Sequence, residues 1–272
     1  MREQARSLST LRRHIERLEA NDMAHPPRRT PLGHAEADAS LQGGLALGAV
    51  HEVFAQAGRQ SAVATGFVAG LASRVAARRP MVWIRQDFTE VETGAVSMSG
   101  FSELGLDPRL LVTVRVTDVD HALRTAADAL ACDAVGAVVL EVWGEARQFD
   151  LVASRKLTLA AQASGATGLM LRMAAEPRAS TAETRWIVRA AHSPPASSPS
   201  SAWGSPLLEA QLVRNRHGPT GRWIMEWKCD ECLFGEPAAY PQPVAAAPAY
   251  RPHQAAVTTS KKAFKRSGYR FA

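Results

Sequence analysis

Hydrophobic and polar positions follow two alternating periods along the middle of the chain, from about residue 48 to residue 227. Short apolar runs predict β-strands over 48–54, 81–84, 110–114, 136–142 and 168–172. Between them, apolar residues recur at helical spacing and predict helices over 65–78, 118–131 and 151–164. Strands that alternate with helices in this way indicate a parallel sheet with helices on both faces.

The pattern changes after residue 184. The segments 184–189, 208–213 and 221–227 alternate polar and apolar residues one by one. This alternation is typical of antiparallel strands that have one face on the core and one face in solvent. We therefore expect an α/β fold with a mainly parallel sheet, flanked by helices, to which antiparallel strands are added.

The two ends of the chain differ from this middle region. Residues 1–20 predict an amphipathic helix, because apolar side chains stand at helical spacing opposite arginines, at Leu8, Leu11, Ile15 and Leu18. Residues 21–44 are rich in Pro, Gly, His and Ala and are interpreted as a linker. The helix either packs on its own domain or, held by that linker, docks on a partner. One domain is expected over 45–235, followed by a disordered, Pro- and Ala-rich basic tail over 236–272.

The composition is that of a globular protein with a core, since 46% of the 272 residues are hydrophobic. No run of about 18 apolar residues occurs, so we expect no transmembrane helix. The charged N-terminus lacks the apolar region of a secretory signal. Three cysteines in a chain of this length suit a reducing compartment. These features favour a cytoplasmic protein that makes no membrane contact.

The net charge of +6 lies at the ends of the chain. The last twelve residues carry five Lys or Arg and no acid, and residues 1–30 carry seven Arg and four acids. The long region between them is slightly negative as a result. A DNA-binding domain carries its cations on the folded part, so this distribution weakens the interpretation as a tight DNA binder and leaves direct DNA contact open.

The segment between the strand at 48–54 and the next helix occupies the position of a phosphate-binding loop. Such a loop needs G-x-x-x-x-G-K-[ST], because backbone N–H groups surround the phosphates, the Lys reaches the terminal phosphates and the hydroxyl holds Mg²⁺. The residues at the four motif positions here are Ala55, Gln60, Ser61 and Ala62, with Gly58 inside the loop. Losing the Lys and the hydroxyl removes several charge-assisted hydrogen bonds of about 1.5–3 kcal/mol each. We therefore expect no nucleotide cofactor and no catalytic residue.

Glu141 follows a strongly apolar strand, at the position of a Walker B acid. Such an acid orders Mg²⁺ together with the loop hydroxyl, which is missing here. We interpret Glu141 as a remnant of that function or as the partner in a salt bridge.

Three segments together resemble RecA-type recombinases. Residues 32–48, with a Gly-Gly turn, resemble the segment that leads into the phosphate-loop strand; residues 136–141 lie where the Walker B strand ends; residues 213–220 resemble a strand end with the V-K-N-K pattern. Within that superfamily, the degenerate phosphate loop, the N-terminal helix and the basic tail look most like the ImuA family. The resemblance covers roughly residues 30–228 and implies a RecA-like core.

Membership of the ImuA family would imply a non-catalytic accessory role in damage-induced, error-prone translesion DNA synthesis. The partners implied by the resemblance are RecA, an ImuB-type protein and, directly or through another protein, an error-prone polymerase III alpha subunit. Two other functions stay open. One is a RecA-like NTPase or recombinase, which saturable ATP binding would favour; the other is a SulA-like cell-division inhibitor, which also resembles a reduced RecA core.

Besides the N-terminal helix, two segments are candidate partner-binding sites. In RecA-like filaments, two Lys at the positions of Arg214 and Arg216, on either side of Asn215, reach the neighbour's ATP. The resemblance implies that these two arginines contact a nucleotide or an acidic group on RecA, and the alternative is a solvated strand end. The tail combines cations with aromatic residues, which suits a protein groove or single-stranded nucleic acid, at Lys261, Lys262, Phe264, Lys265, Arg266, Tyr269 and Phe271.

Cys229 and Cys232 have the C-x-x-C spacing of a zinc half-site or a redox pair. Zinc would need two more ligands, and His217 and His253 are distant in the sequence. We favour chance or local packing as the reason for this spacing and expect no metal site.

Overall fold

The computed structural model of the chain describes residues 27–55, 60–192 and 206–237, all of which belong to one unit. The helix expected over 1–20, Gly58 of the degenerate loop and the basic tail residues lie outside these ranges. Among the described residues, no helix combines the length and the apolar character that a membrane crossing requires.

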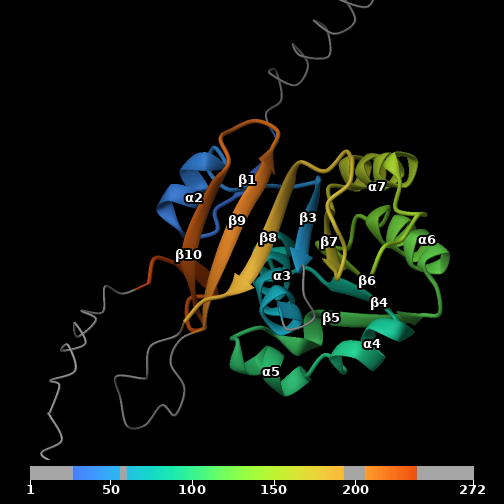
Figure 1. Ribbon diagram of the computed structural model, residues 1–272, viewed down its shortest axis with the longest axis horizontal. Coiled ribbons are helices and arrows are strands. Elements are labelled where there is room, and N and C mark those ends of the chain that lie inside the picture. Colours follow the sequence, from blue (N-terminus) through green and yellow to red (C-terminus); the bar gives the residue numbers. More distant parts are fainter. Residues whose placement is uncertain (1–26, 56–59, 193–205, 238–272) are drawn as a thin grey trace, which may run out of the picture. The chain divides into compact units, whose positions relative to one another are not determined.

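A single nine-stranded sheet organises the described residues, in the order β11-β10-β9-β8-β3-β7-β6-β4-β5 (Figure 1). Its six neighbouring parallel strands are β3 (Val50–Ala55), β4 (Met81–Gln86), β5 (Leu111–Val116), β6 (Ala137–Trp143), β7 (Thr167–Met173) and β8 (Thr184–Ala190). Antiparallel strands extend it, namely β9 (Leu207–Asn215), β10 (Gly221–Lys228) and β11 (Leu233–Gly235). The expected α/β fold class is confirmed.

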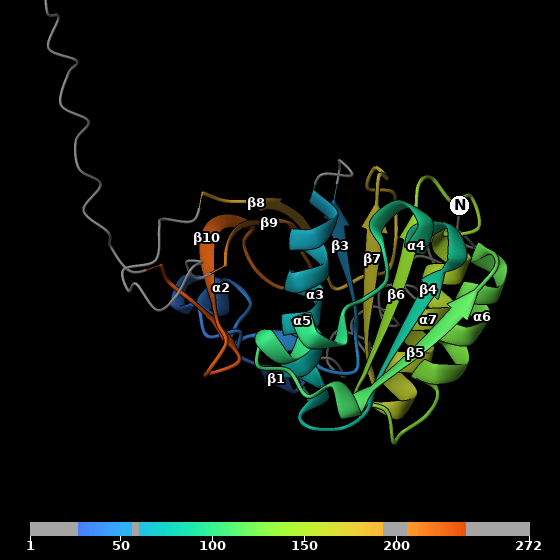
Figure 2. The same cartoon turned by 90° about the horizontal axis from the view of Figure 1, so that it is seen from below.

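Helices cover both faces of the parallel part (Figure 2). The long helix α3 (Ser61–Ala76) packs on one face, and α6 (Val119–Leu130) and α7 (Leu151–Ser164) pack on the other. Asp118 and Asp150 cap α6 and α7 by accepting hydrogen bonds from the backbone N–H groups of His121 and Ala153. Since apolar residues of the strands face both ways, each face has its own buried core.

The segment that follows β4 contains short helices that the sequence pattern did not predict. They are α4 (Asp87–Thr93), α5 (Met98–Glu103) and a 3₁₀ turn, η2 (Pro108–Leu110). Each spans two turns or fewer, which is too short to develop a clear apolar period. Phe101 of α5 is nevertheless buried and contacts Trp83 of β4 edge-on, with 6.0 Å between ring centroids.

The linker interpretation of residues 21–44 is wrong for the part that the structure describes. β1 (Arg29–Thr30) pairs with β2 (Leu45–Ala46), and α2 (Ala35–Ser40) packs against β10. Leu32, Ala37 and Leu41 are buried in the core on the α3 side. Burial of these three apolar residues holds the Pro- and Gly-rich stretch on the domain, although its composition is that of a linker.

Two expectations about the strands and helices need correction. Helix α3 begins at Ser61 rather than at Thr65, and Gln60 is its N-cap residue. Strand β8 is antiparallel only to β9, and it runs parallel to β3. The change from parallel to antiparallel pairing therefore falls between β8 and β9.

Candidate functional site

The residues of the degenerate phosphate loop lie where β3 meets α3, at the carboxyl end of the parallel strands. Ala55 is the buried last residue of β3, and Ser61 and Ala62 are the first residues of α3. The Gln60 side-chain oxygen accepts a hydrogen bond of 2.7 Å from the backbone N–H of Ala190, at the end of β8. A glycine at this position would leave its space to a phosphate. Here the side chain is instead tied to the neighbouring strand.

A buried ion pair occupies the position of the Walker B acid. Arg85 of β4 and Glu141 of β6 stand opposite each other in register, and Arg85 donates to both carboxylate oxygens, from Nε at 2.8 Å and from Nη2 at 3.1 Å. Trp83 donates a third bond from its indole N–H at 2.8 Å. The side chains of Arg85 and Glu141 are 5% and 0% exposed. The expectation that Glu141 forms a salt bridge is confirmed.

The guanidinium of Arg85 is also bound on its other side. It donates to the backbone carbonyl of Gly94 at 2.9 Å and to the hydroxyl of Thr93 at 3.0 Å, at the end of α4. The Thr93 hydroxyl in turn donates to the carbonyl of Thr89. This network of hydrogen bonds fixes α4 to the sheet. The charges of Arg85 and Glu141 therefore have a structural role.

These residues do not fit a magnesium nucleotide. The carboxylate of Glu141 accepts three hydrogen bonds and would have to leave a buried pair to bind a metal ion. Ala62 presents a methyl group where a hydroxyl would hold the ion, and Ser61 replaces the lysine. This arrangement of residues stabilises the fold and is not suited to phosphoryl transfer.

Arg214, Asn215 and Arg216 lie at the opposite, amino-terminal edge of the parallel strands. Arg214 donates to the backbone carbonyl of Ser180 at 2.8 Å, and burial together with the nearby Arg185 and Arg216 lowers its pKa. The Asn215 amide donates to the carbonyls of Ser40 and Pro219, so it ties α2 to the β9–β10 turn. Arg216 is exposed, and its backbone N–H bonds to Glu183. Of the three side chains, Arg216 has the most freedom to meet a partner.

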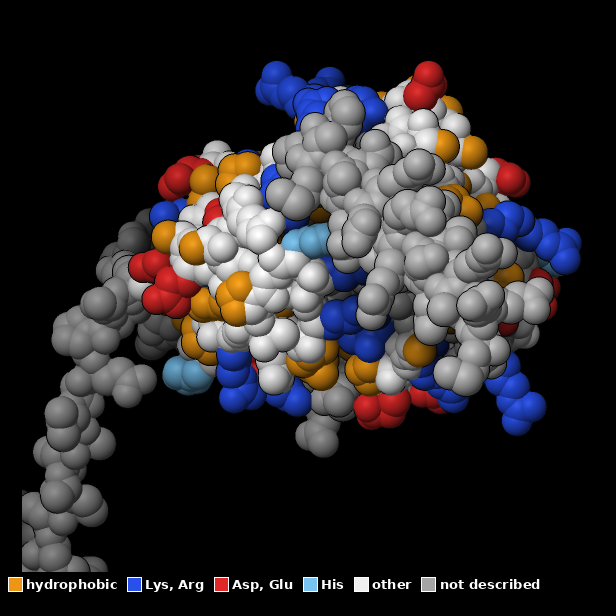
Figure 3. All heavy atoms as spheres, turned by 90° about the horizontal axis from the view of Figure 1, so that it is seen from above, with side chains coloured by type: hydrophobic (Ala, Val, Ile, Leu, Met, Phe, Trp, Pro, Cys, Tyr) orange, Lys and Arg blue, Asp and Glu red, His pale blue; other side chains and the backbone are white. Residues whose placement is uncertain are grey.

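Arg216 shares a cavity of about 1010 Å³ with other arginines that come from distant parts of the sequence. Arg28, Arg29 and Arg79 line the same cavity, while Glu183 is its only acidic lining residue and has a carboxylate oxygen 3.4 Å from Nε2 of His217. Figure 3 views the molecule from this edge of the sheet and shows Lys and Arg side chains gathered in the middle of the face, next to a histidine. Of the three predicted partner-binding segments, this is the one that the structure describes.

The C-x-x-C residues pack locally. The Cys232 thiol donates to the carbonyl of Gly105 at 3.1 Å, and burial together with Asp230 raises the pKa of the Cys229 thiol above its usual value. A raised pKa disfavours the reactive thiolate. Within the described ranges, no cluster of His, Cys, Asp and Glu has the size of a metal site.

Sequence reasoning missed Arg85 as the partner of Glu141, although a signal existed. Each of the two residues is a single charge inside an apolar strand, in Met81–Gln86 and in Ala137–Trp143. Buried charges in proteins are paired, so two isolated charges in neighbouring strands would have suggested each other. Trp83 gave no signal in the sequence beyond its apolar character.

The fold and the site together define a class of protein, which is a phosphate-loop-type α/β domain whose phosphate-binding side chains have been replaced. No family model matches the chain. The chain is 30% identical over 201 residues to Protein ImuA of Caulobacter vibrioides strain NA1000 / CB15N, an alignment that covers 68% of this chain and 77% of the relative. The same values hold for Protein ImuA of strain ATCC 19089 / CIP 103742 / CB 15. The chain belongs to the ImuA family.

Proposed function

We propose that this protein is a non-catalytic accessory factor of damage-induced, error-prone translesion DNA synthesis, and that it acts by binding an ImuB-type protein and RecA. An error-prone polymerase III alpha subunit belongs to the same assembly, through direct or indirect contact. Membership of the ImuA family supports the cellular context. The observation that carries the non-catalytic role is the buried Arg85–Glu141 pair at the position where an NTPase holds its metal-ordering acid.

The first test separates this function from that of an NTPase. A strain that lacks the gene is complemented with the wild type or with a Gln60→Ala/Ser61→Ala variant, and mutation frequency is measured after ultraviolet damage. We expect the deletion to abolish induced mutagenesis and both versions to restore it, since neither side chain serves phosphate chemistry. Saturable micromolar ATP binding by the purified protein, or a folded variant that fails to complement, would contradict the proposal.

A second test concerns Arg216 as a contact to RecA. Arg216→Ala removes an exposed cation that makes no side-chain hydrogen bond to the described residues, so the fold should be preserved. Arg147→Ala removes an exposed arginine elsewhere and is the matched control. We expect RecA binding, measured by biolayer interferometry, to weaken about tenfold for Arg216→Ala alone, because bonds to charged partners contribute about 1.5–3 kcal/mol. Equal affinities of the two variants would remove Arg216 from the interface.

A cell-division inhibitor would give a different phenotype. Overproduction of a protein that blocks division produces long, undivided cells, whereas an accessory factor of translesion synthesis leaves cell length unchanged. Microscopy of the same strain with the gene overexpressed therefore tests that alternative.

A further inference from the structure

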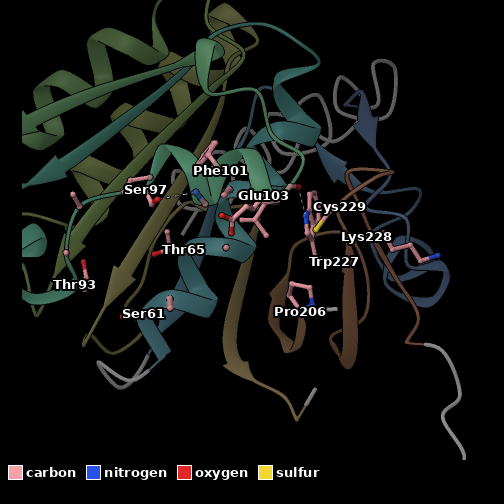
Figure 4. A pocket seen from close by; sticks show the side chains of 18 of the residues that line it. Ser61, Thr65, Thr93, Ser97, Phe101, Glu103, Pro206, Trp227, Lys228 and Cys229 are labelled. Atoms are coloured by element: carbon pink, nitrogen blue, oxygen red, sulfur yellow. Dashed lines mark hydrogen bonds between the residues drawn. The ribbon is translucent and has the colours of Figure 1, made fainter. Parts of the chain in front are cut away.

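A second cavity lies beside the degenerate phosphate loop, on the α3 face of the sheet. Its volume is about 970 Å³, and it opens between the first half of α3, the segment from Thr93 to Leu104 and the end of β10 with the turn after it. We call it the α3–β10 groove; Figure 4 labels ten of its lining side chains, from Ser61 and Thr65 on the helix to Trp227 on the strand and Cys229 in the turn after it. The groove adjoins the degenerate loop, since Ser61 and Ala62 line one end of it and Arg85 of the buried ion pair lines it as well.

The floor of the groove consists of small residues of α3. Ala62, Thr65, Gly66 and Ala69 line it, and a Cβ atom built on Gly66 would meet nothing within 4 Å. One turn further along the helix the situation reverses, since a Cβ on Gly70 would come within 2.7 Å of Phe234 and 2.8 Å of Trp227. The open stretch of α3 therefore ends where β10 and β11 close over the helix.

The walls of the groove are apolar and are held together at one end. Phe101 and Leu104 line one wall, and Trp227 lines the other. The Trp227 indole N–H donates to the backbone carbonyl of Leu104 at 2.9 Å, which bridges the two walls. Gly105 approaches so closely that a Cβ there would stand 2.1 Å from the carbonyl oxygen of Cys229. Because the walls are fixed to each other, the groove is preformed.

The rim of the groove is acidic. Glu103 and Asp230 line it and make no ion pair with described residues. Glu231 lies 3.9 Å from Lys228, and Glu226 stands with Lys228 on the face of β10 opposite Trp227. Figure 4 shows the Lys228 side chain extending away from the other lining side chains. Arg85, the other cation of the lining, is neutralised by Glu141. The groove therefore combines an apolar interior with an uncompensated negative rim.

We propose that the α3–β10 groove binds a basic segment of a partner protein, which places an aromatic or aliphatic side chain on the small residues of α3 and its Lys or Arg residues on Glu103 and Asp230. Charge complementarity selects this occupant, because nucleic acid and nucleotides would be repelled by the rim. The volume lies at the upper end of the range of about 300–1,000 Å³ for binding pockets, which suits anchor side chains rather than a whole domain. The inference rests on the proposed accessory role and deepens it by giving the partner a chemistry.

The test uses displayed random dodecapeptides selected on the full-length protein, followed by fluorescence anisotropy with the enriched peptides. Gly66→Leu fills the open floor without a clash at Cβ, and Gly66→Ala, which adds one methyl group, is its control. Glu103→Lys/Asp230→Lys reverses two rim charges, and Asp128→Lys, an exposed acid of α6 outside the groove, is the charge control. Urea unfolding of every variant verifies that it folds.

We expect the enriched peptides to combine Lys or Arg with Phe, Tyr, Trp or Leu. Gly66→Leu and the double charge reversal should each weaken their binding about tenfold or more, a change of about 1.4 kcal/mol, with both controls near wild type. Enriched peptides that are acidic, or that bind folded Gly66→Leu as tightly as the wild type, would overturn the proposal.

Two other occupants would give distinct results, and each would also overturn the proposal. If removal of residues 238–272 tightens binding of the enriched peptides about tenfold or more, the occupant is the basic end of the same chain. If the protein sediments as a dimer and Gly66→Leu makes it a monomer, the occupant is a second copy. The proposed accessory function is tested separately by the deletion strain, so it can stand when the groove fails.

Discussion

At the residue scale, the buried charges of Arg85 and Glu141 are explained by each other. Arg85 and Glu141 neutralise each other, and Trp83, Thr93 and Gly94 complete the hydrogen bonds of the pair. Such a pair costs desolvation energy when it forms, and removing one partner leaves an uncompensated buried charge. The pair therefore preserves the fold at the position where related folds place their chemistry.

Glu141→Leu is expected to lower the free energy of unfolding by about 3–5 kcal/mol, because Arg85 would stay buried without its partner. Urea denaturation followed by tryptophan fluorescence measures this change. The double variant Arg85→Met/Glu141→Leu should recover more than half of the loss, since it removes both charges. A single variant as stable as the wild type would show that water already reaches this pair.

His51 provides a pH dependence at the same scale. Its ring is completely buried, with Nε2 2.9 Å from the carbonyl oxygen of Ala46 and Nδ1 2.8 Å from the hydroxyl of Thr184. These partners suit a neutral ring that donates from Nε2 and accepts at Nδ1. Burial lowers the pKa of His51 from 6.5 to about 4, so the ring stays neutral in the folded protein.

Between pH 6.5 and pH 4, the unfolded chain binds a proton at His51 that the folded chain does not bind, so stability falls as the pH falls. We expect a loss of about 2 kcal/mol from pH 7 to pH 5, measured by urea unfolding. His51→Gln retains a polar side chain without a proton equilibrium, and its loss over the same interval should be smaller by about this amount. An equal pH dependence in both proteins would mean that other groups cause it.

At the scale of elements, α3 divides into an open half and a covered half, and one glycine marks each half. Around Gly66 the helix borders the α3–β10 groove, whereas at Gly70 it lies under Trp227 and Phe234. Glycine is therefore favoured at these two positions for different physical reasons. Gly70 is required by a close approach of aromatic rings, and Gly66 is required only if something fills the space beside it.

The two glycines give opposite expectations for the same substitution. Gly66→Ala should raise the free energy of unfolding by about 0.5–1 kcal/mol through helix propensity. Gly70→Ala should lower it by about 1–3 kcal/mol, because rigid rings would have to move. Thermal and urea unfolding of the pair measure both effects. Destabilisation by Gly66→Ala would show that its surroundings are less open than described.

Elements with a strong period were predictable from the sequence, and elements defined by long-range contacts were not. The bounds expected for α7 are confirmed at Leu151 and Ser164, since Asp150 and Gly165 mark its ends locally. The folding of residues 29–44 depends instead on burial of Leu32 and Leu41 against α3-side residues far along the chain. The pairing of Arg85 with Glu141 likewise joins strands that only the tertiary structure places side by side.

At the scale of the whole molecule, the last described strand completes a core to which the first described residues, such as Leu32, also belong. Phe234 of β11 is fully buried, and its ring lies 4.7 Å from that of Trp227 and 5.1 Å from that of Phe67, measured between centroids. Its backbone N–H bonds to the carbonyl of Leu32. The two ends of the described domain therefore support each other across α3.

Phe234→Ala should accordingly destabilise the whole domain by about 3–5 kcal/mol, through lost burial and the cavity left behind. Ile224→Ala on neighbouring β10 is the control, because that side chain is 41% exposed and should cost less than about 1 kcal/mol. Guanidinium denaturation observed by circular dichroism measures both. A loss confined to local fluorescence, with unchanged global unfolding, would show that β11 is not part of the cooperative unit.

The place of β3 in the middle of the sheet has a consequence for synthesis of the protein. Both neighbours of β3, which are β7 and β8, begin only at Thr167 and Thr184. At a translation rate of about 5–20 residues per second, the nascent central strand waits roughly 6–22 s for its first neighbour. During that time its hydrogen-bonding edges are open to other nascent chains or to a chaperone, and ribosomal pausing ahead of Thr167 lengthens the interval in which aggregation competes with folding.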